Sequence, residues 1–252
     1  MKLMWIESIC DEEQVVENNI RLTKIKIPDY EEFNEEEATL HFKEKLKKLS
    51  SYYETITEDE YENISYVKLI NIGKEVEIHN IDGYIQSKVL SYIMNLQIYP
   101  RPIYLTRHGE SLFNLDDRIG GDSDLSEGGI EYSKLLNEIL QNETKTKEFI
   151  LSETKPKILT STLLRARKTA SYIDIGVKPI SLKILDEINS GLYDGLSYKE
   201  IEEKFPEDFF ERSEDKLRYR FPRGESYLDL IQRIEPVIYE IERSRGPVIV
   251  VN

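Results

Sequence analysis

Hydrophobic residues in the second half of the chain fall into four short runs, separated by longer amphipathic stretches. Runs this short, bounded by polar residues, are typical of buried strands. The stretches between them repeat apolar residues at three- and four-residue spacing, which predicts helices. Strands that alternate with helices predict a parallel α/β sheet with helices on both faces. The predicted strands are Ile103 to Thr106, Lys157 to Thr160, Leu182 to Leu185 and Val248 to Val251, and the predicted helices include Ile130 to Leu140, Leu163 to Ile173, one opened by a Ser197-to-Glu200 capping box, and Tyr227 to Ile241.

The first half alternates strand and helix patterns in the same way. Asn34, with Glu37 three residues later, predicts the start of a helix that continues to Ser50. Pro100 and Pro102 cannot continue a helix and restrict the residues before them, so we expect a domain boundary here, with domains at residues 1–98 and 99–252. The remaining predicted elements are strands at Leu3 to Ile9 and Tyr66 to Gly73 and a helix over Ile81 to Leu96.

Net charge and cysteine content narrow the class of protein. The 34 Lys and Arg residues against 48 Asp and Glu residues give a net charge of −14, so the overall field repels nucleic acid, which needs a basic face. Cys10 is the single cysteine and no group of histidines accompanies it, which predicts a reducing, cytoplasmic compartment and no metal site. Because Leu3 to Ile6 is far shorter than the roughly 20 apolar residues of a membrane span, neither a membrane nor a nucleic acid is an expected partner.

The clearest chemical signal is the segment Leu105 to Ser111, directly after the first strand of the second half. Ligands of open α/β sheets bind at the carboxyl ends of the strands, which is where His108 falls. A lone histidine is more often a packed or surface residue. Arg107 before it, Gly109 after it and the place at a strand end favour a functional histidine instead.

The sequence Arg107-His108-Gly109 is the signature of the histidine phosphatase superfamily. The second half resembles the bisphosphatase half of the bifunctional 6-phosphofructo-2-kinase/fructose-2,6-bisphosphatase family, and the first half resembles the C-terminal part of its kinase domain. The resemblance implies a three-layer histidine-phosphatase-like parallel sheet, preceded by the C-terminal part of a P-loop-kinase-like α/β domain. Segments that carry it are Ile119 to Ser123, Leu125-Ser126, Thr160-Ser161, Asp186 to Ile188 and Gly224 to Tyr227 in the second half, and Glu7 to Asp11, Pro28 to Tyr30, Ile70 to Gly73 and Asp82 to Lys88 in the first.

The chemistry of the family suits these residue types. A neutral imidazole attacks phosphorus and forms a phosphohistidine, which divides one difficult hydrolysis into two easier steps, and the resemblance assigns this role to His108. Guanidinium groups stabilise the charge on the transferring phosphoryl oxygens, a role that falls to Arg107 and Arg165, with Asn114 as a neutral donor. The departing sugar oxygen needs a proton, and the resemblance assigns the carboxylic acid to Glu187. A solvated loop carboxylate is the alternative for that residue.

A second group of cations follows at four-residue spacing, on what the sequence predicts as one helical face. Three cations on a face are usually a solvated surface. The resemblance implies instead that they hold the sugar phosphate, in a local basic pocket that attracts an anion despite the net negative charge. The residues of this predicted substrate site are Arg212, Lys216 and Arg220, together with Gly120, Tyr198 and Tyr227.

Two features depart from the family. Members need a second catalytic histidine just after the last strand, whereas this sequence stops at Asn252, and its other histidines, His41 and His79, lie in the first half. No Gly-x-x-x-x-Gly-Lys-Ser/Thr phosphate loop occurs, because Gly73-Lys74 is followed by Glu75. We therefore expect a chain truncated at both ends, with no kinase activity and with weak or no phosphatase activity of its own.

The sequence thus predicts a fructose-2,6-bisphosphate 2-phosphatase that acts through a phosphohistidine, as part of a bifunctional enzyme that sets the level of this sugar phosphate. The phosphatase reaction needs no cofactor or metal, whereas ATP and Mg belong to the kinase of a full-length relative. A sugar phosphate is the expected partner, and a homodimer is expected from the resemblance alone. Two alternatives remain: a phosphoglycerate-mutase-like phosphatase, which does not account for the first hundred residues, and a non-catalytic truncated paralogue that binds sugar phosphate without turnover.

Overall fold

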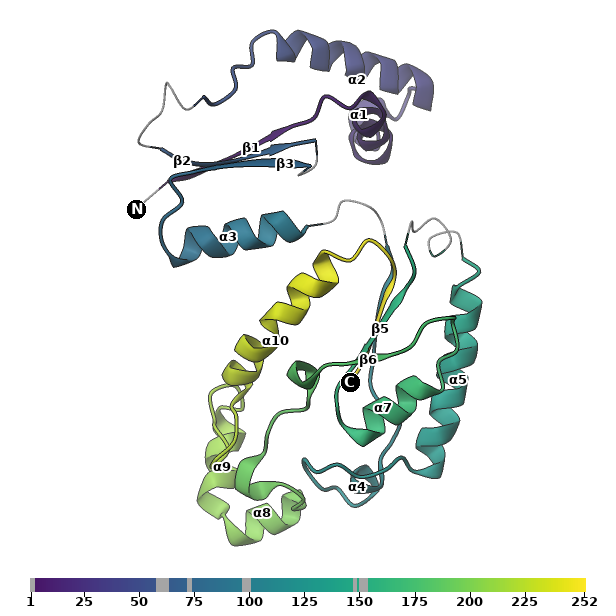
Figure 1. Cartoon of the computed structure of the whole chain (residues 1–252), viewed down its shortest axis with the longest axis vertical. Helices are drawn as coiled ribbons and strands as arrows, with labels where there is room; N and C mark the ends of the chain where they lie inside the picture. Colours follow the sequence, from purple (N-terminus) through teal and green to yellow (C-terminus); the bar gives the residue numbers. More distant parts are fainter. Residues whose placement is uncertain (1–2, 58–63, 72–73, 97–100, 147–148, 150–153) are drawn as a thin grey trace. The chain divides into compact units, whose positions relative to one another are not determined.

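The computed structural model describes residues 3–57, 64–71, 74–96, 101–146, 149 and 154–252. They form two compact units, residues 1–94 and 95–252 (Figure 1). The boundary that the sequence predicts between residues 98 and 99 lies outside the described residues. None of the helices in the described part of the chain has the length and apolar character that a membrane span requires.

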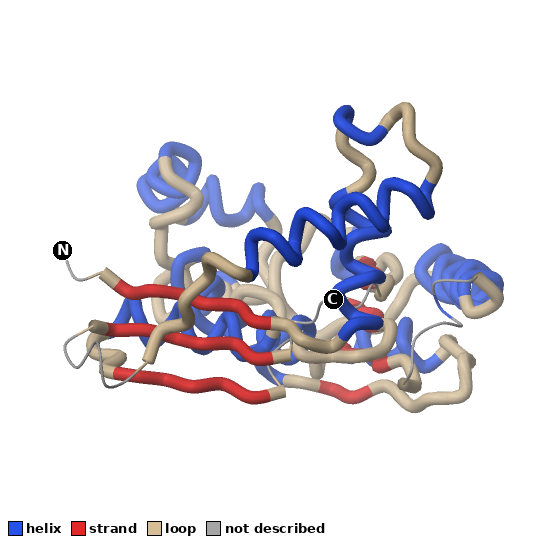
Figure 2. The backbone as a smooth tube through the Cα atoms, turned by 90° about the horizontal axis from the view of Figure 1, so that it is seen from above, coloured by secondary structure: helices blue, strands red, loops and turns tan. Residues whose placement is uncertain are grey.

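Within the described residues of the first unit, three strands lie side by side in the order β1-β2-β3 (Figure 2). The pairing of β1 with β2 is parallel and that of β2 with β3 is antiparallel. Figure 1 draws α2 on one side of this sheet and α3 on the other. The elements are β1 (Met4–Ile9), α1 (Glu13–Asn19), a π-helical turn (Ile20–Lys24), a 3-10 turn (Pro28–Tyr30), α2 (Glu35–Ser50), β2 (Ser65–Ile70), β3 (Glu75–His79) and α3 (Tyr84–Asn95).

Local sequence signals account for most of the first unit. The strand predicted at Leu3 to Ile9 is confirmed, and so is the helix cap, because the Asn34 side chain accepts a hydrogen bond of 2.9 Å from the Glu37 backbone N–H. Strand β3, in which acidic residues alternate with Val76 and Ile78, was not predicted from the sequence. The predicted start of the last helix at Ile81 was wrong, since the chain turns at a positive-φ glycine before α3 begins. The predicted strand end at Ile72 and Gly73 lies outside the described residues.

The described strands of the second unit form one parallel sheet in the order β4-β7-β5-β6, which confirms the predicted α/β class. Strand β7 lies between β4 and β5, and all of its residues are buried. The strand predicted at Leu182 to Leu185 was wrong: the strand is two residues earlier and Lys183 to Leu185 form a 3-10 turn that buries Leu185 in the core. The strands are β4 (Ile103–Thr106), β5 (Lys157–Thr160), β6 (Ile180–Ser181) and β7 (Val248–Val251).

Helices cover both faces of this sheet, which confirms the three-layer arrangement (Figure 1). Alternate residues of β5 and β7 point to opposite faces: Ile158 packs with α5 and α7 on one side, and Leu159 packs with α10 on the other. The 3-10 turns are Lys183–Leu185 and Gly191–Tyr193. The helices of this unit are α4 (Leu112–Leu115), α5 (Glu127–Glu143), α7 (Leu164–Ser171), α8 (Tyr198–Lys204), α9 (Pro206–Glu214) and α10 (Tyr227–Glu242).

Two glycines let the loop after β4 pack against the first turn of α5. A β-carbon on Gly129 would lie 2.1 Å from the Glu110 carbonyl oxygen, and one on Gly109 would lie 2.3 Å from the Gly129 carbonyl oxygen. We expect Gly129→Ala to lower the free energy of unfolding by about 1–3 kcal/mol, because backbone must move to admit the methyl group. Urea unfolding checks this, with Gly128→Ala as the matched control.

At Gly128 the added β-carbon would meet its first neighbour, the Glu110 carboxylate, at an ordinary 3.5 Å. Alanine there should leave stability unchanged or raise it by up to about 1 kcal/mol, as helix propensity predicts. If the two alanine variants were equally stable, the close approach of the loop to α5 would be contradicted.

Candidate active site

His108 lies in the loop that leaves β4 at the carboxyl end of the sheet. Its backbone N–H donates a hydrogen bond of 2.9 Å to the Asn252 carbonyl, next to the end of β7. The following N–H, of Gly109, donates to Thr169 Oγ1 on α7 at 2.9 Å. The His108 side chain is almost fully buried, with the residue 6 % exposed. The histidine is therefore held by the sheet on one side and by a helix on the other.

The ring of His108 has one acceptor and one donor nitrogen. Arg165 Nε, which can only donate, lies 2.9 Å from His108 Nε2, so Nε2 carries a lone pair. The hydrogen is then on Nδ1, which donates to the Gly109 carbonyl at 2.7 Å. Burial, with the charges of Arg165 and Arg107, holds the pKa of His108 below its ordinary value of 6.5, against the opposing effects of the Gly109 carbonyl and Glu187. The imidazole is neutral at physiological pH, with Nε2 free of a proton.

Arg165 connects the histidine to the rest of the site. It comes from the first turn of α7, and its side chain is 4 % exposed. Its Nη1 donates to the Gly121 carbonyl at 2.9 Å, and its Nη2 lies 3.5 Å from Glu187 Oε2. Asn114 Oδ1 accepts from the Ser111 backbone N–H at 2.9 Å. This contact orients the Asn114 amide so that its NH₂ group can serve a ligand.

Arg165, Asn114 and Glu187 border a cavity of about 360 Å³. Gly120 fits there only as glycine, because it has φ +65° and a β-carbon would lie 1.9 Å from the Asp194 carboxylate. His108 is not on the wall and reaches the cavity through Arg165. The predicted site residues that the structure brings together on this wall are Arg107, Asn114, Gly120, Arg165, Glu187, Tyr198, Arg212 and Tyr227.

A buried neutral histidine beside a buried arginine, with a carboxylate across a cavity, is an arrangement suited to phosphoryl transfer. The sequence model of the histidine phosphatase superfamily, branch 1, matches residues 103–252, which contain all of these groups. The chain belongs to this superfamily. A second model, 6-phosphofructo-2-kinase, matches residues 1–100.

Curated relatives confirm the resemblance to the bifunctional family. The chain is 42% identical to a 6-phosphofructo-2-kinase/fructose-2,6-bisphosphatase of Arabidopsis thaliana, over 100% of this chain and 33% of that protein. It is 39% identical to the Gallus gallus protein of the same name, over 99% of this chain and 51% of the relative. A Saccharomyces cerevisiae fructose-2,6-bisphosphatase is 37% identical, over 99% of this chain and 53% of the relative. The chain thus spans between a third and about half of the length of these relatives.

Solved structures agree on the fold. A mycobacterial glucosyl-3-phosphoglycerate phosphatase aligns with a TM-score of 0.50 and 26% identity, over 60% of this chain and 75% of that one. A putative α-ribazole-5'-P phosphatase from Escherichia coli aligns with a TM-score of 0.51 and 21% identity, over 60% and 73% of the two chains. The second likeness supports the fold alone.

One cation on the cavity wall contacts two aromatic rings. The Arg212 guanidinium lies 5.5 Å from the centre of the Tyr198 ring and 5.4 Å from that of Phe221. Contacts of this kind fix the direction of a guanidinium group and leave its N–H donors free for an anion. Arg212 therefore presents a positioned cation on the cavity wall.

The helical face predicted for Arg212, Lys216 and Arg220 was wrong. Helix α9 ends at Glu214, because the Asp215 carboxylate accepts the Arg218 backbone N–H and starts a turn. Lys216 is exposed, Arg220 pairs with Asp229 at 2.5 Å, and within the described residues neither borders the cavity. Their contact with substrate stays a prediction.

The structure adds residues that the sequence did not single out. Arg118 borders the same cavity, with its guanidinium on the Gly195 carbonyl and Glu200. Arg233 borders a second cavity, of about 400 Å³, which shares Arg165 and Glu187 with the first. Backbone carbonyls distant in the sequence hold both arginines, Gly195 for Arg118 and Ile184 and Asp186 for Arg233, and no local motif marks such contacts. In the parts of the chain that the structure describes, no group of three or more His, Cys, Asp or Glu residues is arranged to hold a metal ion.

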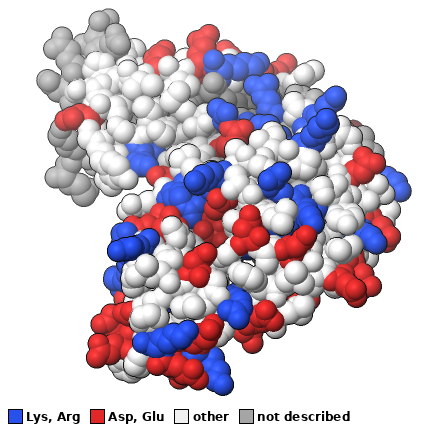
Figure 3. Space-filling view, turned by 60° about the horizontal axis from the view of Figure 1, so that its bottom comes forward, with Lys and Arg blue, Asp and Glu red and all other residues white. Residues whose placement is uncertain are grey.

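Charges of both signs are mixed on the surface (Figure 3), whereas positive charge predominates around the first cavity. On the face drawn in Figure 3, basic and acidic side chains alternate and do not gather into one basic area. The residues that line the first cavity include four arginines, Arg107, Arg118, Arg165 and Arg212, against two carboxylates, Asp117 and Glu187. A small anion therefore meets a local cationic site on a protein of net charge −14.

Proposed function

We propose that this chain transfers the 2-phosphoryl group of fructose 2,6-bisphosphate to His108 and then to water, which yields fructose 6-phosphate and inorganic phosphate. The observation that carries the proposal is His108 Nε2, which is buried, free of a proton and 2.9 Å from Arg165 Nε. The names of the curated relatives support the substrate. In the longer bifunctional proteins this activity would oppose a 6-phosphofructo-2-kinase.

In the first step the Arg165 Nε–H leaves the Nε2 lone pair and turns to a phosphoryl oxygen. Nε2 attacks phosphorus, the P–N bond forms and the bond from phosphorus to the sugar 2-oxygen breaks. The departing oxygen takes a proton from the Glu187 carboxylic acid. Since Arg165 already contacts Nε2, an oxygen on phosphorus bound to Nε2 falls within its reach. Arg107 and Asn114 donate to the remaining oxygens.

In the second step water attacks the phosphohistidine, the P–N bond breaks, and the Glu187 carboxylate accepts a proton from that water. His108 returns to its neutral form with the lone pair on Nε2. The proposal requires no cofactor. Arg212, which lines the same cavity beside the Tyr198 and Phe221 rings, is proposed to bind the 6-phosphate with Tyr227. A cytoplasmic location, which rests on the single cysteine Cys10, and a homodimer, which rests on the resemblance, complete the proposal.

The proposal is tested with fructose 2,6-bisphosphate radiolabelled at either the 2- or the 6-phosphate. Protein-bound label is expected from the 2-labelled sugar alone, because only that phosphoryl group is transferred. Binding of the sugar without any label on the protein would overturn the proposal in favour of a non-catalytic protein. Label taken from 2,3-bisphosphoglycerate but not from the sugar would overturn it in favour of a phosphoglycerate-mutase-like enzyme.

The protonation state of His108 gives a separate prediction. Because burial and two arginines lower the pKa of His108, its ring should gain a proton only below pH 6.5, and the nucleophile should be lost as the pH falls through that lowered value. NMR titration of the His108 ring in the free chain measures this, with the His108→Ala spectrum to assign the signal. A midpoint above 6.5 would contradict the neutral, buried nucleophile.

A further inference from the structure

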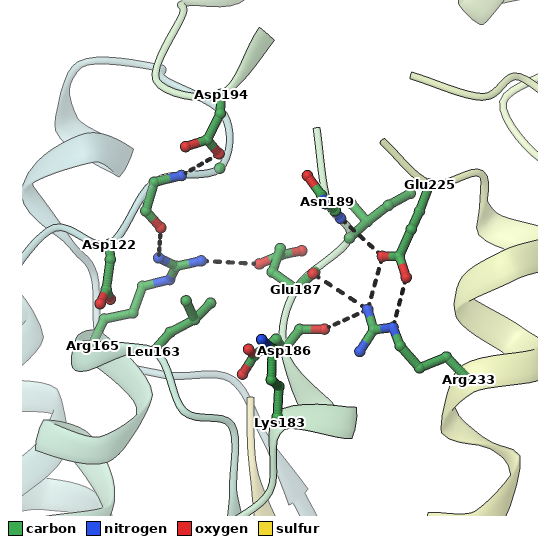
Figure 4. Close-up of a pocket in the computed structure, with 13 residues that line it drawn as sticks. Asp122, Leu163, Arg165, Lys183, Asp186, Glu187, Asn189, Asp194, Glu225 and Arg233 are labelled. Carbon is green, nitrogen blue, oxygen red and sulfur yellow. Dashed lines mark hydrogen bonds and ion pairs between the residues drawn. The ribbon is translucent and has the colours of Figure 1, made fainter. Parts of the chain in front are cut away.

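Arg233 extends from α10 to the segment that carries Glu187 (Figure 4). Its Nη1 donates to the Ile184 carbonyl at 2.7 Å, and its Nη2 donates to the carbonyls of Asp186 at 2.9 Å and Glu187 at 3.4 Å. One guanidinium thus contacts three backbone carbonyls around Glu187. Lysine, with a single nitrogen, lacks the fork that makes these contacts together.

Glu225 completes the contact from the other end of the segment. Its two carboxylate oxygens accept from Arg233 Nε at 2.7 Å and Nη2 at 3.0 Å. The same carboxylate accepts the Asn189 backbone N–H at 3.0 Å, and the Glu225 N–H donates to the Asn189 carbonyl at 2.9 Å. Burial opposes ionisation of Glu225, but Arg233 and the Asn189 N–H outweigh it and hold the pKa of the carboxyl below its ordinary value.

A third contact ties the segment to the loop before α7. The Asp186 carboxylate accepts the Thr162 backbone N–H at 2.7 Å and the Thr162 hydroxyl at 2.8 Å. Thr162 is three residues before Arg165, whose guanidinium faces Glu187. The Glu187 side chain itself is 48 % exposed, so packing around it does little to hold it. Its place relative to Arg165 is set by the backbone, and the backbone is held by Arg233, Glu225 and Asp186.

We propose that the Arg233–Glu225 ion pair is a positioning device that holds Glu187 at the distance from Arg165 needed for proton transfer to the sugar oxygen. This inference rests on the proposed function, in which Glu187 is the acid. Arg233 does not touch the reacting atoms. It acts through the backbone of residues 184–189, and its loss should therefore affect the steps that need the acid and spare those that do not.

The test compares two phosphoryl donors in single-turnover labelling of His108. Fructose 2,6-bisphosphate has a poor leaving group that needs a proton, whereas 2,4-dinitrophenyl phosphate leaves without one. Replacing the acid, Glu187→Gln, should slow transfer from the sugar about 10²-fold, the lower end of the range for general acid catalysis, and leave transfer from the aryl phosphate nearly unchanged. Arg233→Lys and Glu225→Gln should also slow transfer from the sugar and spare the aryl phosphate, but by about 10-fold.

A double variant tells positioning from a general structural role. If Arg233 acts through Glu187, Arg233→Lys should cost nothing further once Glu187→Gln is present, since the two changes remove the same contribution. Arg243→Lys is the matched control, because the exposed Arg243 follows directly after α10 and pairs with Glu240, and this variant should resemble the parent chain. The urea midpoints of all variants are measured alongside.

The outcomes separate the two proposals. If the parent chain takes label from neither position of the sugar, the proposed function fails and this inference fails with it. If the parent chain is labelled but Arg233→Lys and Glu225→Gln slow both donors equally, or the losses in the double variant multiply, the positioning role alone is overturned. The positioning role is supported if Arg233→Lys slows transfer from the sugar alone and slows it no further when Glu187→Gln is already present.

Discussion

Replacing His108 by alanine is expected to abolish the labelling of the chain by fructose 2,6-bisphosphate. The ring is held by Arg165 at Nε2 and by the Gly109 carbonyl at Nδ1, so the proton is on Nδ1 and Nε2 keeps a lone pair, which accepts from Arg165 in the free chain. Alanine removes that lone pair, and no other ring nitrogen of a histidine lies in the second unit, since the remaining histidines are His41 and His79. The measurement is the amount of acid-labile, base-stable phosphate on the protein after a single turnover.

His41→Ala and His79→Ala are the controls for this prediction. His41 contacts Tyr30 at 3.1 Å and His79 stacks on Tyr66, both in the first unit. Each variant should be labelled as the parent chain is. Label that persisted in His108→Ala, or disappeared in either control, would rule out His108 as the acceptor.

Arg165→Ala is expected to slow phosphoryl transfer by about 10³-fold, the upper range for loss of one group that stabilises a developing charge. Arg165 has two tasks: it keeps a proton off His108 Nε2 by donating to it, and it lies between the histidine and Glu187, where the transferring oxygens must pass. Arg165→Lys keeps the charge but loses the fork, so it should recover only part of the rate. Rapid-quench labelling of His108 measures both variants.

Arg167 provides the matched control for Arg165. It lies two residues further along α7 and is exposed, so alanine there should leave the labelling rate unchanged. Because Arg165 also donates to the Gly121 carbonyl, the urea midpoint of each variant is compared to separate loss of fold from loss of rate. Arg165→Ala that stayed folded and transferred phosphate at the parent rate would contradict the site described above.

Local sequence patterns predict the elements of this protein where the signal is itself local. The four-residue run at Val248 to Val251 is a central buried strand, as expected. Ser197 with Glu200 forms the predicted capping box, because both hydrogen bonds are made within one turn. The strand predicted at Leu182 to Leu185 was wrong, since an apolar run is buried equally well by a 3-10 turn packed against α10. A run of apolar residues indicates that the segment is buried, but tertiary contacts decide whether it is a strand or a turn.

Residue types and a family motif predict the centre of the site, and tertiary contacts supply the rest. His108 was marked by its neighbours in sequence, but the identity of its lone-pair nitrogen depends on Arg165, 57 residues away. Glu225 lies only eight residues before Arg233, but the role of Arg233 could not be found from sequence, because its other partners are backbone carbonyls 46 to 49 residues away, which any residue type provides. The helix predicted at Lys216 ends before that residue, because the chain turns at Asp215.

The most direct test of the account is the position of the phosphoryl group on the trapped intermediate. The chain, labelled with ¹⁵N in its histidines, is reacted with fructose 2,6-bisphosphate and denatured in base, and the P–N bond is assigned by ³¹P and ¹⁵N NMR beside peptide mapping. Since Nδ1 donates to the Gly109 carbonyl and Nε2 has the lone pair, phosphate is predicted on Nε2 of His108. Phosphate on Nδ1, or on any other residue, would contradict the account.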